Sequence, residues 1–369
     1  MTLPLLDNGT FFFPGPTEVR AEVLQAMTRP MVAHRGKVFE DVFGRLQVAL
    51  QVIFGTSRPV YISSSSATGL MEAGARCAPA GRILCIVNGA FSARFAAIVA
   101  ACAREHDVLE VPWGDTVDLD RLAAQLASTR YAAVTVVHSE TSTGALTDVR
   151  AVTRLAHEHG AVCLVDSVTG IGAAELRFDE WELDYALTGS QKALALPPGL
   201  AFAAASSAFI VSAKQQPGRG LYFDLVEFDA YALKNQTPNT PAIPLFFAAG
   251  VQLPAIAAET MRGRWDRHAS MAQRTHAWVA QLAARHGDAI GVLAAAGHRS
   301  PSVTSIMLPA TVSASSVLRA VTEQGFTIGS GYGKNKETSV RIGHMGDHTL
   351  AGLERCLAAC DRAFDAVMR

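Results

Sequence analysis

One lysine lies where its amine could act as a nucleophile. The apolar run Asp184–Thr188 is followed by Gly189-Ser190-Gln191-Lys192, and then by the apolar Ala193–Leu196 and by Pro197-Pro198-Gly199. A lysine in apolar surroundings loses part of its hydration, which lowers its pKa and leaves a neutral amine able to attack an aldehyde. The alternative interpretation is a lysine whose stem packs on the protein while its ammonium reaches solvent.

A carboxylate ends a second apolar run. Asp166 and Ser167 directly follow Ala161–Val165. A carboxylate at the end of a buried strand is costly unless a cation accompanies it. That cation could be a protonated ring nitrogen of a ligand, or a structural arginine or lysine.

A serine-rich turn could bind an anion. Residues 63–69 read Ser-Ser-Ser-Ser-Ala-Thr-Gly and connect the apolar run Pro59–Ile62 to a helical pattern. Small residues, hydroxyls and the free N–H groups of a helix N-terminus suit a phosphate. The alternative is an ordinary turn in which Ser66 or Thr68 caps the helix.

Three further segments carry side chains that suit a ligand. Phe91 follows the run Arg82–Val87 and could stack on a flat ring, or simply be part of the core. The polar loop His138–Gly144 follows Tyr131–Val137 and could contact a ligand or form a capped turn. Arg341, within Ser339–Ile342, could clamp a carboxylate with two parallel hydrogen bonds, or be an exposed strand residue.

The elements that must position these residues alternate between strand and helix. We interpret the near-continuous apolar runs as buried parallel strands with helices on both faces, a doubly wound α/β sheet whose ligands bind at the carboxyl ends of the strands. Leu200–Val211 is interpreted as a further strand of this series. The intervening helical patterns are Ala67–Cys77, Ala90–Glu105, Leu119–Ser128 and Val149–His159.

The pattern changes near residue 250. A long helix is predicted over Pro254–His286, followed by a smaller α+β unit with strands at Val303–Leu308, Phe326–Gly329 and Ser339–Ile342 and helices at Ser313–Gln324 and Thr349–Met368. We therefore predict an N-terminal arm and large domain over residues 1–250, and a linking helix and small C-terminal domain over residues 251–369.

Composition and charge limit the possible partners. The 369 residues are 49% hydrophobic and 18% charged with a formal net charge of −1, so nucleic acid and membrane are not expected as partners. No CxxC pair occurs among the six cysteines, which we interpret as buried small hydrophobes, and no metal is expected. The N-terminal residues lack the pattern of a signal peptide, so the cytoplasm is the expected compartment.

Together the strand ends match the needs of one cofactor, pyridoxal 5'-phosphate (PLP). PLP needs an anion site, a ring stacker, an acid beside its pyridine nitrogen and a lysine for a Schiff base. The chain also resembles the class V aminotransferases of fold type I, in particular their alanine/serine–glyoxylate (serine–pyruvate) group. The most specific motifs are Asp166-Ser167 and Gly189-Ser190-Gln191-Lys192, and the resemblance runs from Phe13-Pro14-Gly15-Pro16-Thr17 to Arg341-Ile342-Gly343-His344-Met345-Gly346.

The resemblance implies a role for each matching residue. Lys192 would hold PLP as a Schiff base and move the substrate's α-proton, and Asp166 would keep the pyridine nitrogen protonated. Arg341 would bind the substrate carboxylate near Gly15. The remaining cofactor contacts would be Phe91 on the ring, Thr141 near the ring hydroxyl, Ser66, Ala67, Thr68 and Gln191 on the phosphate, and Thr237 and Thr240 reaching the phosphate from a second subunit.

The implied enzyme is a homodimer with its active site at the subunit interface, which transaminates between a small amino acid and a 2-oxo acid such as glyoxylate or pyruvate. His34-Arg35 would lie near the partner's site. This sequence departs from the family where Ser64 and Ala67 occupy expected glycine positions, and where Phe91 replaces a frequent tryptophan. The role of His344 stays open.

Other activities on the same fold remain alternatives. The amine donor could be aspartate, ureidoglycine, aminoethylphosphonate or pyridoxamine. A PLP lyase such as a cysteine desulfurase needs a reactive cysteine on a loop of the small domain, and Thr322–Lys334 contains none. A nicotinamide-dependent enzyme would need GxGxxG after its first strand, and this motif is missing there. A non-catalytic PLP-binding protein would need an added DNA-binding domain or a lost lysine.

Overall fold

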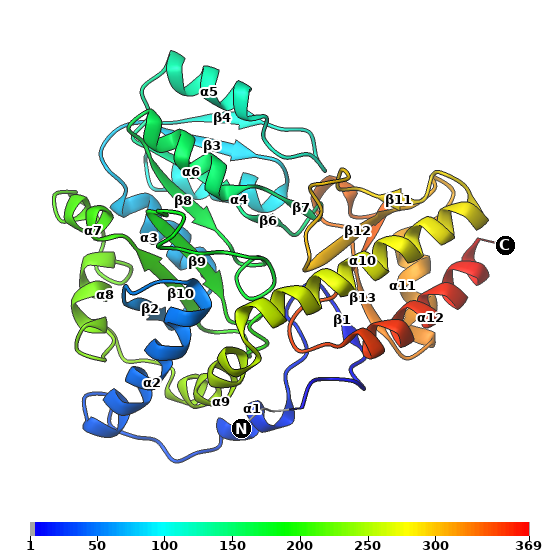
Figure 1. Ribbon diagram of the computed structural model, residues 1–369, viewed down its shortest axis with the longest axis horizontal. Helices are drawn as coiled ribbons and strands as arrows, with labels where there is room; N and C mark the ends of the chain where they lie inside the picture. Colours follow the sequence, from blue (N-terminus) through cyan, green and yellow to red (C-terminus); the bar gives the residue numbers. More distant parts are fainter. Residues whose placement is uncertain (1–3, 369) are drawn as a thin grey trace.

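The computed structural model describes residues 4–368 and has two parts, each built around a sheet (Figure 1). The larger part holds a seven-stranded sheet, and the smaller part holds a five-stranded sheet. The long helix α10 (Met261–His286) leads from the first part into the second.

The large sheet is parallel except for one strand. Only β10 runs against its neighbours, since it pairs antiparallel with both β2 and β9. Four of the central strands are buried along their whole length, which explains why they appear in the sequence as continuous apolar runs. The spatial order is β2 (Val60–Ser63), β10 (Ala201–Ala205), β9 (Tyr185–Gly189), β8 (Val162–Asp166), β5 (Ala133–Val137), β3 (Ile83–Val87) and β4 (His106–Glu110).

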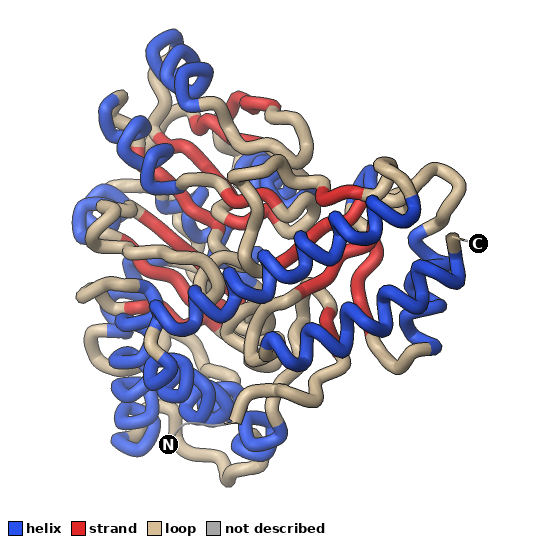
Figure 2. The backbone as a smooth tube through the Cα atoms, turned by 45° about the vertical axis from the view of Figure 1, so that its right-hand side comes forward, coloured by secondary structure: helices blue, strands red, loops and turns tan. Residues whose placement is uncertain are grey.

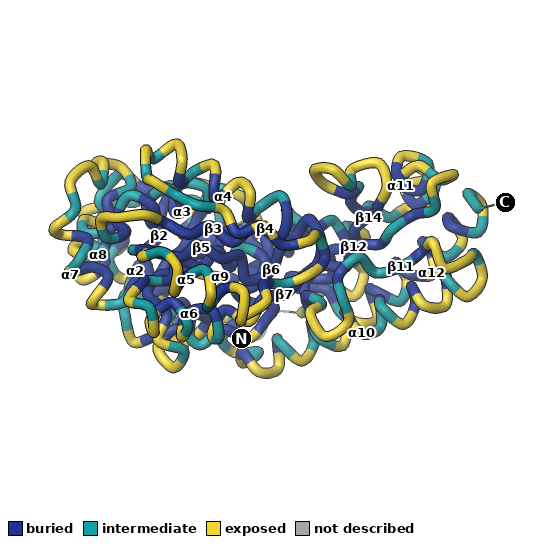
Figure 3. Tube along the Cα trace, turned by 90° about the horizontal axis from the view of Figure 1, so that it is seen from above, coloured by how far each residue is buried: buried dark blue, intermediate teal, exposed yellow. Residues whose placement is uncertain are grey.

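Helices cover both faces of the large sheet (Figure 3). On one face lie α3 (Ala67–Cys77) and α4 (Ala90–Ala101), and on the other lie α5 (Leu119–Ser128) and α6 (Val149–Glu158). Asp118 and Asp148 start α5 and α6 by accepting hydrogen bonds from the N–H groups three residues ahead, at 2.8 and 3.0 Å. This part also contains α1 (Ala21–Ala26), α2 (Lys37–Phe54), α8 (Leu225–Ala232), β6 (Ser139–Glu140) and β7 (Ala145–Leu146).

The apolar stretch Leu200–Val211 is not one strand, so that prediction was wrong. Strand β10 ends at Ala205, and α7 (Ser207–Ala213) follows at once. Ser206 starts the helix, because its hydroxyl accepts a hydrogen bond from the Phe209 N–H at 3.1 Å. A continuous apolar run does not distinguish strand from helix by its period, and the capping serine was the missed signal.

The predicted long helix is two helices. The chain forms α9 (Ile243–Glu259) and then α10, with Thr260 between them at a φ of 66°. Thr260 caps α10, since its hydroxyl accepts from the Gly263 N–H at 3.1 Å. Among the described residues no single helix is long and apolar enough to cross a membrane, and α9 and α10 meet that test only as a pair bent by 85°.

The small domain packs its helices on one face of its sheet. The long helix α10 and the C-terminal helix α12 (Leu350–Val367) lie in front of the small sheet in Figure 2, and α11 (Ala314–Glu323) packs beside α12. This cluster buries Trp278, Phe364 and the two cysteines of α12. The sheet order is β1 (Phe11–Phe12), β13 (Thr327–Ser330), β14 (Ser339–Gly343), β12 (Val303–Met307) and β11 (Gly291–Val292), with a 3₁₀ turn η1 at Gly333–Asn335.

The N-terminal arm reaches the small domain. Strand β1 pairs parallel with β13, so Phe12 is buried in the small domain's core although it precedes the large domain in sequence. The boundary predicted near residue 250 lies inside α9. The arm therefore passes between the two sheets, where Pro14 and Gly15 reach the candidate site.

Candidate active site

The sequence-predicted residues from four strand ends and from the small domain meet at one edge of the large sheet. A cavity of about 530 Å³ lies there, with Lys192 and Phe91 from the large domain and Arg341 from β14. The N-terminal arm adds Phe13, Pro14 and Gly15 to its lining. The cavity lies at the carboxyl ends of parallel strands, where such sheets bind ligands.

Lys192 is a buried amine. Its side chain is 8% exposed, and its Nζ donates a hydrogen bond to the Pro14 carbonyl at 2.5 Å. The pKa of Lys192 is lowered to about 8, chiefly by burial and then by the nearby positive charge of Arg341, while Asp166 opposes both. Thr17 fixes the backbone here: its hydroxyl donates to the Lys192 carbonyl at 3.1 Å. The alternative of a lysine that reaches solvent does not hold.

Gly15 is required by the lysine. Its φ is +100°, and a Cβ at this position would lie 2.2 Å from the Lys192 Nζ. A side chain would therefore both strain the backbone and collide with the amine. The structure places Gly15 directly against Lys192.

Asp166 ends β8 as a buried carboxyl. It is 2% exposed and accepts one backbone hydrogen bond, from the Val168 N–H at 2.9 Å. Burial raises the pKa of Asp166 to about 7 against that hydrogen bond; Glu140 adds to the rise and Lys192 opposes it. No ion pair to Asp166 occurs within residues 4–368. This donor set fits PLP, because a protonated pyridine nitrogen would supply the missing cation.

The polar loop 138–144 supports the site through a residue that sequence reasoning missed. Glu140 is fully buried and caps α4, since its carboxylate accepts from the Ser92 N–H at 2.9 Å and from the Phe91 N–H at 3.3 Å. The Thr141 hydroxyl hydrogen-bonds the Thr169 hydroxyl. The loop therefore does contain a capping residue: Glu140 binds the first turn of α4, which carries Phe91.

Arg341 is a buried guanidinium without a carboxylate partner among the described residues. It is 5% exposed and donates only to carbonyls, those of Ser330 at 2.8 Å and Thr141 at 3.1 Å. Burial lowers its pKa to about 10, which still leaves it protonated near neutral pH. Tyr332, also missed, lies beneath it: its ring is 5.5 Å from the guanidinium and 5.1 Å from the ring of Phe91.

The predicted phosphate turn begins α3 with free backbone donors. Ser66 is the N-cap residue, but its side chain makes no capping hydrogen bond. Neither Ser64 nor Ala67 has a positive φ, so the absence of glycine at these positions costs no strain. The Thr68 hydroxyl accepts from Arg94 at 3.3 Å.

Of the predicted site residues, only Gly15, Phe91, Lys192 and Arg341 line the cavity itself within one chain. Thr237 and Thr240 line a small separate recess beside Ser63 and Ser64. Arg35 holds this segment by donating to the Thr237 carbonyl at 2.6 Å. His344 also points elsewhere, since its Nε2 bonds the Thr304 hydroxyl at 2.8 Å and its Nδ1 the Pro301 carbonyl at 2.9 Å, and burial lowers its pKa to about 3.

Comparison with known proteins identifies the family. The model of "Aminotransferase class-V" matches residues 61–342. The chain belongs to the class V aminotransferases. It is 31% identical to the L-aspartate–glyoxylate aminotransferase of Paracoccus denitrificans, over 94% of this chain and 89% of that protein. It is 30% identical to the serine–glyoxylate aminotransferase of Arabidopsis thaliana, over 95% and 88%.

The fold also matches that of a solved aminotransferase structure. The alanine–glyoxylate aminotransferase of Nostoc sp. superposes with a TM-score of 0.89 at 26% identity, covering 98% of this chain and 96% of that one. The predicted family, the fold of type I and the PLP cofactor are therefore confirmed, and this class V enzyme is a transaminase.

Proposed function

We propose that this aminotransferase transfers the amino group of a small amino acid, alanine or serine, to glyoxylate or pyruvate at the cavity around Lys192. The observation that carries the proposal is the meeting of a buried amine of lowered pKa, a buried carboxyl and a buried guanidinium without a carboxylate partner at one strand edge. Relatives of about 30% identity that act on serine or aspartate with glyoxylate support it.

The residues around the cavity would hold PLP in one orientation. Lys192 would bind it covalently, Asp166 would face its pyridine nitrogen, and Phe91 would stack on the ring, with Thr141 near the ring hydroxyl. When bound, PLP supplies an electron sink for the substrate's α-carbon. The phosphate would lie on the N-terminus of α3, with contacts from Ser66, Ala67, Thr68 and Gln191.

The chain's own groups would then do two jobs. Arg341 binds the α-carboxylate with a bidentate pair and fixes the substrate's orientation. Lys192, neutral in part at physiological pH because of its lowered pKa, takes the α-proton and returns it during the second half of the exchange. Gly15 leaves room for the amine to move between these positions.

A homodimer would complete the phosphate site. The segment with Thr237 and Thr240 lies outside its own chain's cavity and is held by Arg35, which supports a role for it in a neighbouring subunit. Exposed apolar side chains on α2, Val38 at 60% and Val48 at 67% exposure, suit burial by a second copy. We place the enzyme in the cytoplasm, because its six cysteines are free thiols and five are buried.

One observation favours a second candidate donor, aspartate. Lys336 lines the cavity with Arg341 and Lys192, and no acidic residue lines it. After Arg341 has bound an α-carboxylate, Lys336 would remain for a second anionic group. Lys336→Ala should lower kcat/KM for aspartate about threefold and leave that for alanine unchanged, the scale of one exposed ion pair.

The deciding experiment is the visible absorption spectrum with a panel of amino acids. The purified protein should be yellow with PLP, and alanine, serine or aspartate should bleach it until glyoxylate or pyruvate restores the colour. The donor that bleaches fastest names the substrate class. Bleaching by none of them, or sulfide release from cysteine, would refute the proposed donor class, and a colourless protein would refute the role of Lys192.

A further inference from the structure

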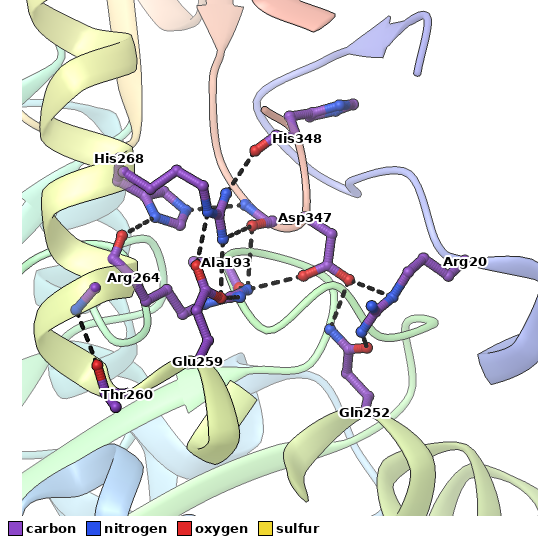
Figure 4. A network of polar contacts seen from close by, with 12 residues as sticks. Arg20, Ala193, Gln252, Glu259, Thr260, Arg264, His268, Asp347 and His348 are labelled. Atoms are coloured by element: carbon purple, nitrogen blue, oxygen red, sulfur yellow. Dashed lines mark hydrogen bonds and ion pairs between the residues drawn. The ribbon is translucent and has the colours of Figure 1, made fainter. Parts of the chain in front are cut away.

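A largely buried ionic network joins α9 and α10 to the loop that follows β14 (Figure 4). Its centre is Arg264 of α10, whose side chain is 1% exposed. Its Nη1 pairs with Glu259 at 2.6 Å, and its Nη2 pairs with Asp347 at 3.2 Å. Asp347 in turn pairs with Arg20 at 2.8 Å and accepts from Gln252 at 2.9 Å.

The same guanidinium contacts the backbone of both catalytic segments. Nη2 donates to the Ala193 carbonyl at 2.5 Å, and Ala193 directly follows Lys192. Nη2 also donates to the Gly346 carbonyl at 3.1 Å, on the loop that leaves the strand of Arg341. One buried side chain thus connects the segment of the amine to the segment of the carboxylate clamp.

The small-domain loop is held from a second side. The Gly346 N–H donates to the His268 Nε2 at 3.1 Å, while the His268 Nδ1 bonds the Arg264 carbonyl at 2.7 Å. These partners leave His268 neutral, with its proton on Nδ1. Gly346, with a φ of +88°, is therefore fixed at both its N–H and its carbonyl by one turn of α10.

We propose that Arg264 is a positioning residue for transamination: it sets the placement of Lys192 relative to Arg341, and thereby brings the α-carbon of a clamped substrate within reach of the amine. The inference rests on the proposed roles of Lys192 and Arg341 and adds the element that couples them. Arg264 does not line the cavity and touches no reacting atom.

A lysine cannot replace this arrangement. The planar guanidinium serves Glu259 on one nitrogen and three acceptors on the other, whereas an ammonium is a compact point charge on a flexible stem. Arg264→Lys keeps the positive charge that Asp347 and Glu259 require but loses the simultaneous contacts to Ala193 and Gly346. The variant therefore tests whether the geometry of the guanidinium, and not only its charge, is needed.

Arg267 offers a matched control on the same helix. It pairs with the same Glu259 at 2.7 Å and donates to the same Gly346 carbonyl at 3.1 Å. It also donates to the His348 carbonyl at 2.5 Å, but no contact joins it to Ala193. Arg267→Lys therefore perturbs the same junction without releasing the lysine segment.

The test compares Arg264→Lys, Arg264→Gln and Arg267→Lys as PLP-loaded enzymes. In both Arg264 variants kcat should fall on the order of 10²-fold, the cost of a displacement of about 1 Å at the reacting groups, while the donor KM changes less than about threefold. With an α-deuterated donor the kinetic isotope effect should rise above the wild-type value, because proton transfer becomes slower than the other steps. Arg267→Lys should keep the wild-type isotope effect.

Every outcome decides the question. A folded Arg264→Lys with wild-type kcat and isotope effect would overturn the proposal. An Arg267→Lys variant whose kcat falls as far as that of Arg264→Lys would also overturn it. Failure of both Arg264 variants to fold, judged by circular dichroism, would show that the network is scaffolding alone. Failure of the wild-type enzyme to be bleached by any donor would instead refute the proposed function.

Discussion

Two regions of the molecule would bind the same cofactor: the region around Lys192 and the turn around Ser66. The single chain supplies more of the first than of the second. Around Lys192 the single chain brings together groups from three segments: Pro14 from the arm, Asp166 from β8 and Arg341 from β14. Around Ser66 the helix N-terminus lies exposed, and Thr237 lies in a separate recess. The difference teaches that one chain by itself brings the amine, the carboxyl and the guanidinium together, whereas Thr237 and Thr240 lie away from them, as the proposed homodimer would require.

The largest effect should come from the Lys192 region. Lys192→Ala should reduce kcat by at least 10²–10⁴-fold, because it removes the amine proposed both to bind PLP covalently and to act as the general base. Steady-state transamination of the best donor measures this. Lys214→Ala, an exposed lysine outside the cavity, is the matched control and should keep full activity. Turnover near the wild-type value in Lys192→Ala would show that the chemistry does not depend on the Lys192 region, which would contradict the comparison.

Asp166 predicts a pH dependence of stability in the PLP-free protein. Its pKa in the folded protein, about 7, lies above the ordinary value of 3.8, so the carboxyl loses its proton at lower pH in the unfolded chain than in the folded one. The stability contributed by the neutral carboxyl is full below pH 3.8 and is lost as pH rises toward 7. Asp166→Asn should therefore be more stable than wild type at pH 8, by roughly 2–4 kcal/mol.

Urea unfolding of both proteins without PLP, at pH 4 and pH 8, measures this difference. Asp184→Asn is the control, because the Asp184 carboxylate accepts from the Cys163 N–H at 2.7 Å and hydrogen-bonds the His157 Nε2 at 2.7 Å, so its loss should destabilise the protein at pH 8. Equal stability of wild type and Asp166→Asn at pH 8 would mean that the carboxyl is not the uncompensated buried group that the geometry indicates.

The smallest effect should come from the phosphate region. Thr237→Val should weaken PLP binding about tenfold, the worth of one or two neutral hydrogen bonds, and leave kcat at saturating PLP unchanged. PLP release on dilution, followed by absorbance, measures it. If the site is shared between subunits, release should be steeper at protein concentrations where the dimer dissociates. Thr311→Val, an exposed threonine of the small domain, should change nothing.

Much of the fold could be predicted because its signals are local. Asp118 and Asp148 mark helix starts within three residues, and the buried strands appear as apolar runs. Asp166 and Lys192 were found because a parallel sheet brings all its carboxyl ends to one edge, so sequence order alone places them together. The break at Thr260 and the end of β10 were missed, since both depend on single capping residues inside apolar or helical runs.

What the sequence by itself determined is the chemical inventory: an amine, a carboxyl, an aromatic ring and a guanidinium, each at the end of its own element or within it. Only the tertiary structure decided how they act on one another. The contact from Lys192 to Pro14 spans 178 residues, and that from Arg341 to Thr141 spans 200. Such contacts leave no periodic signal, because burial, pKa and the linkage through Arg264 arise only when distant segments exclude water from the same small volume.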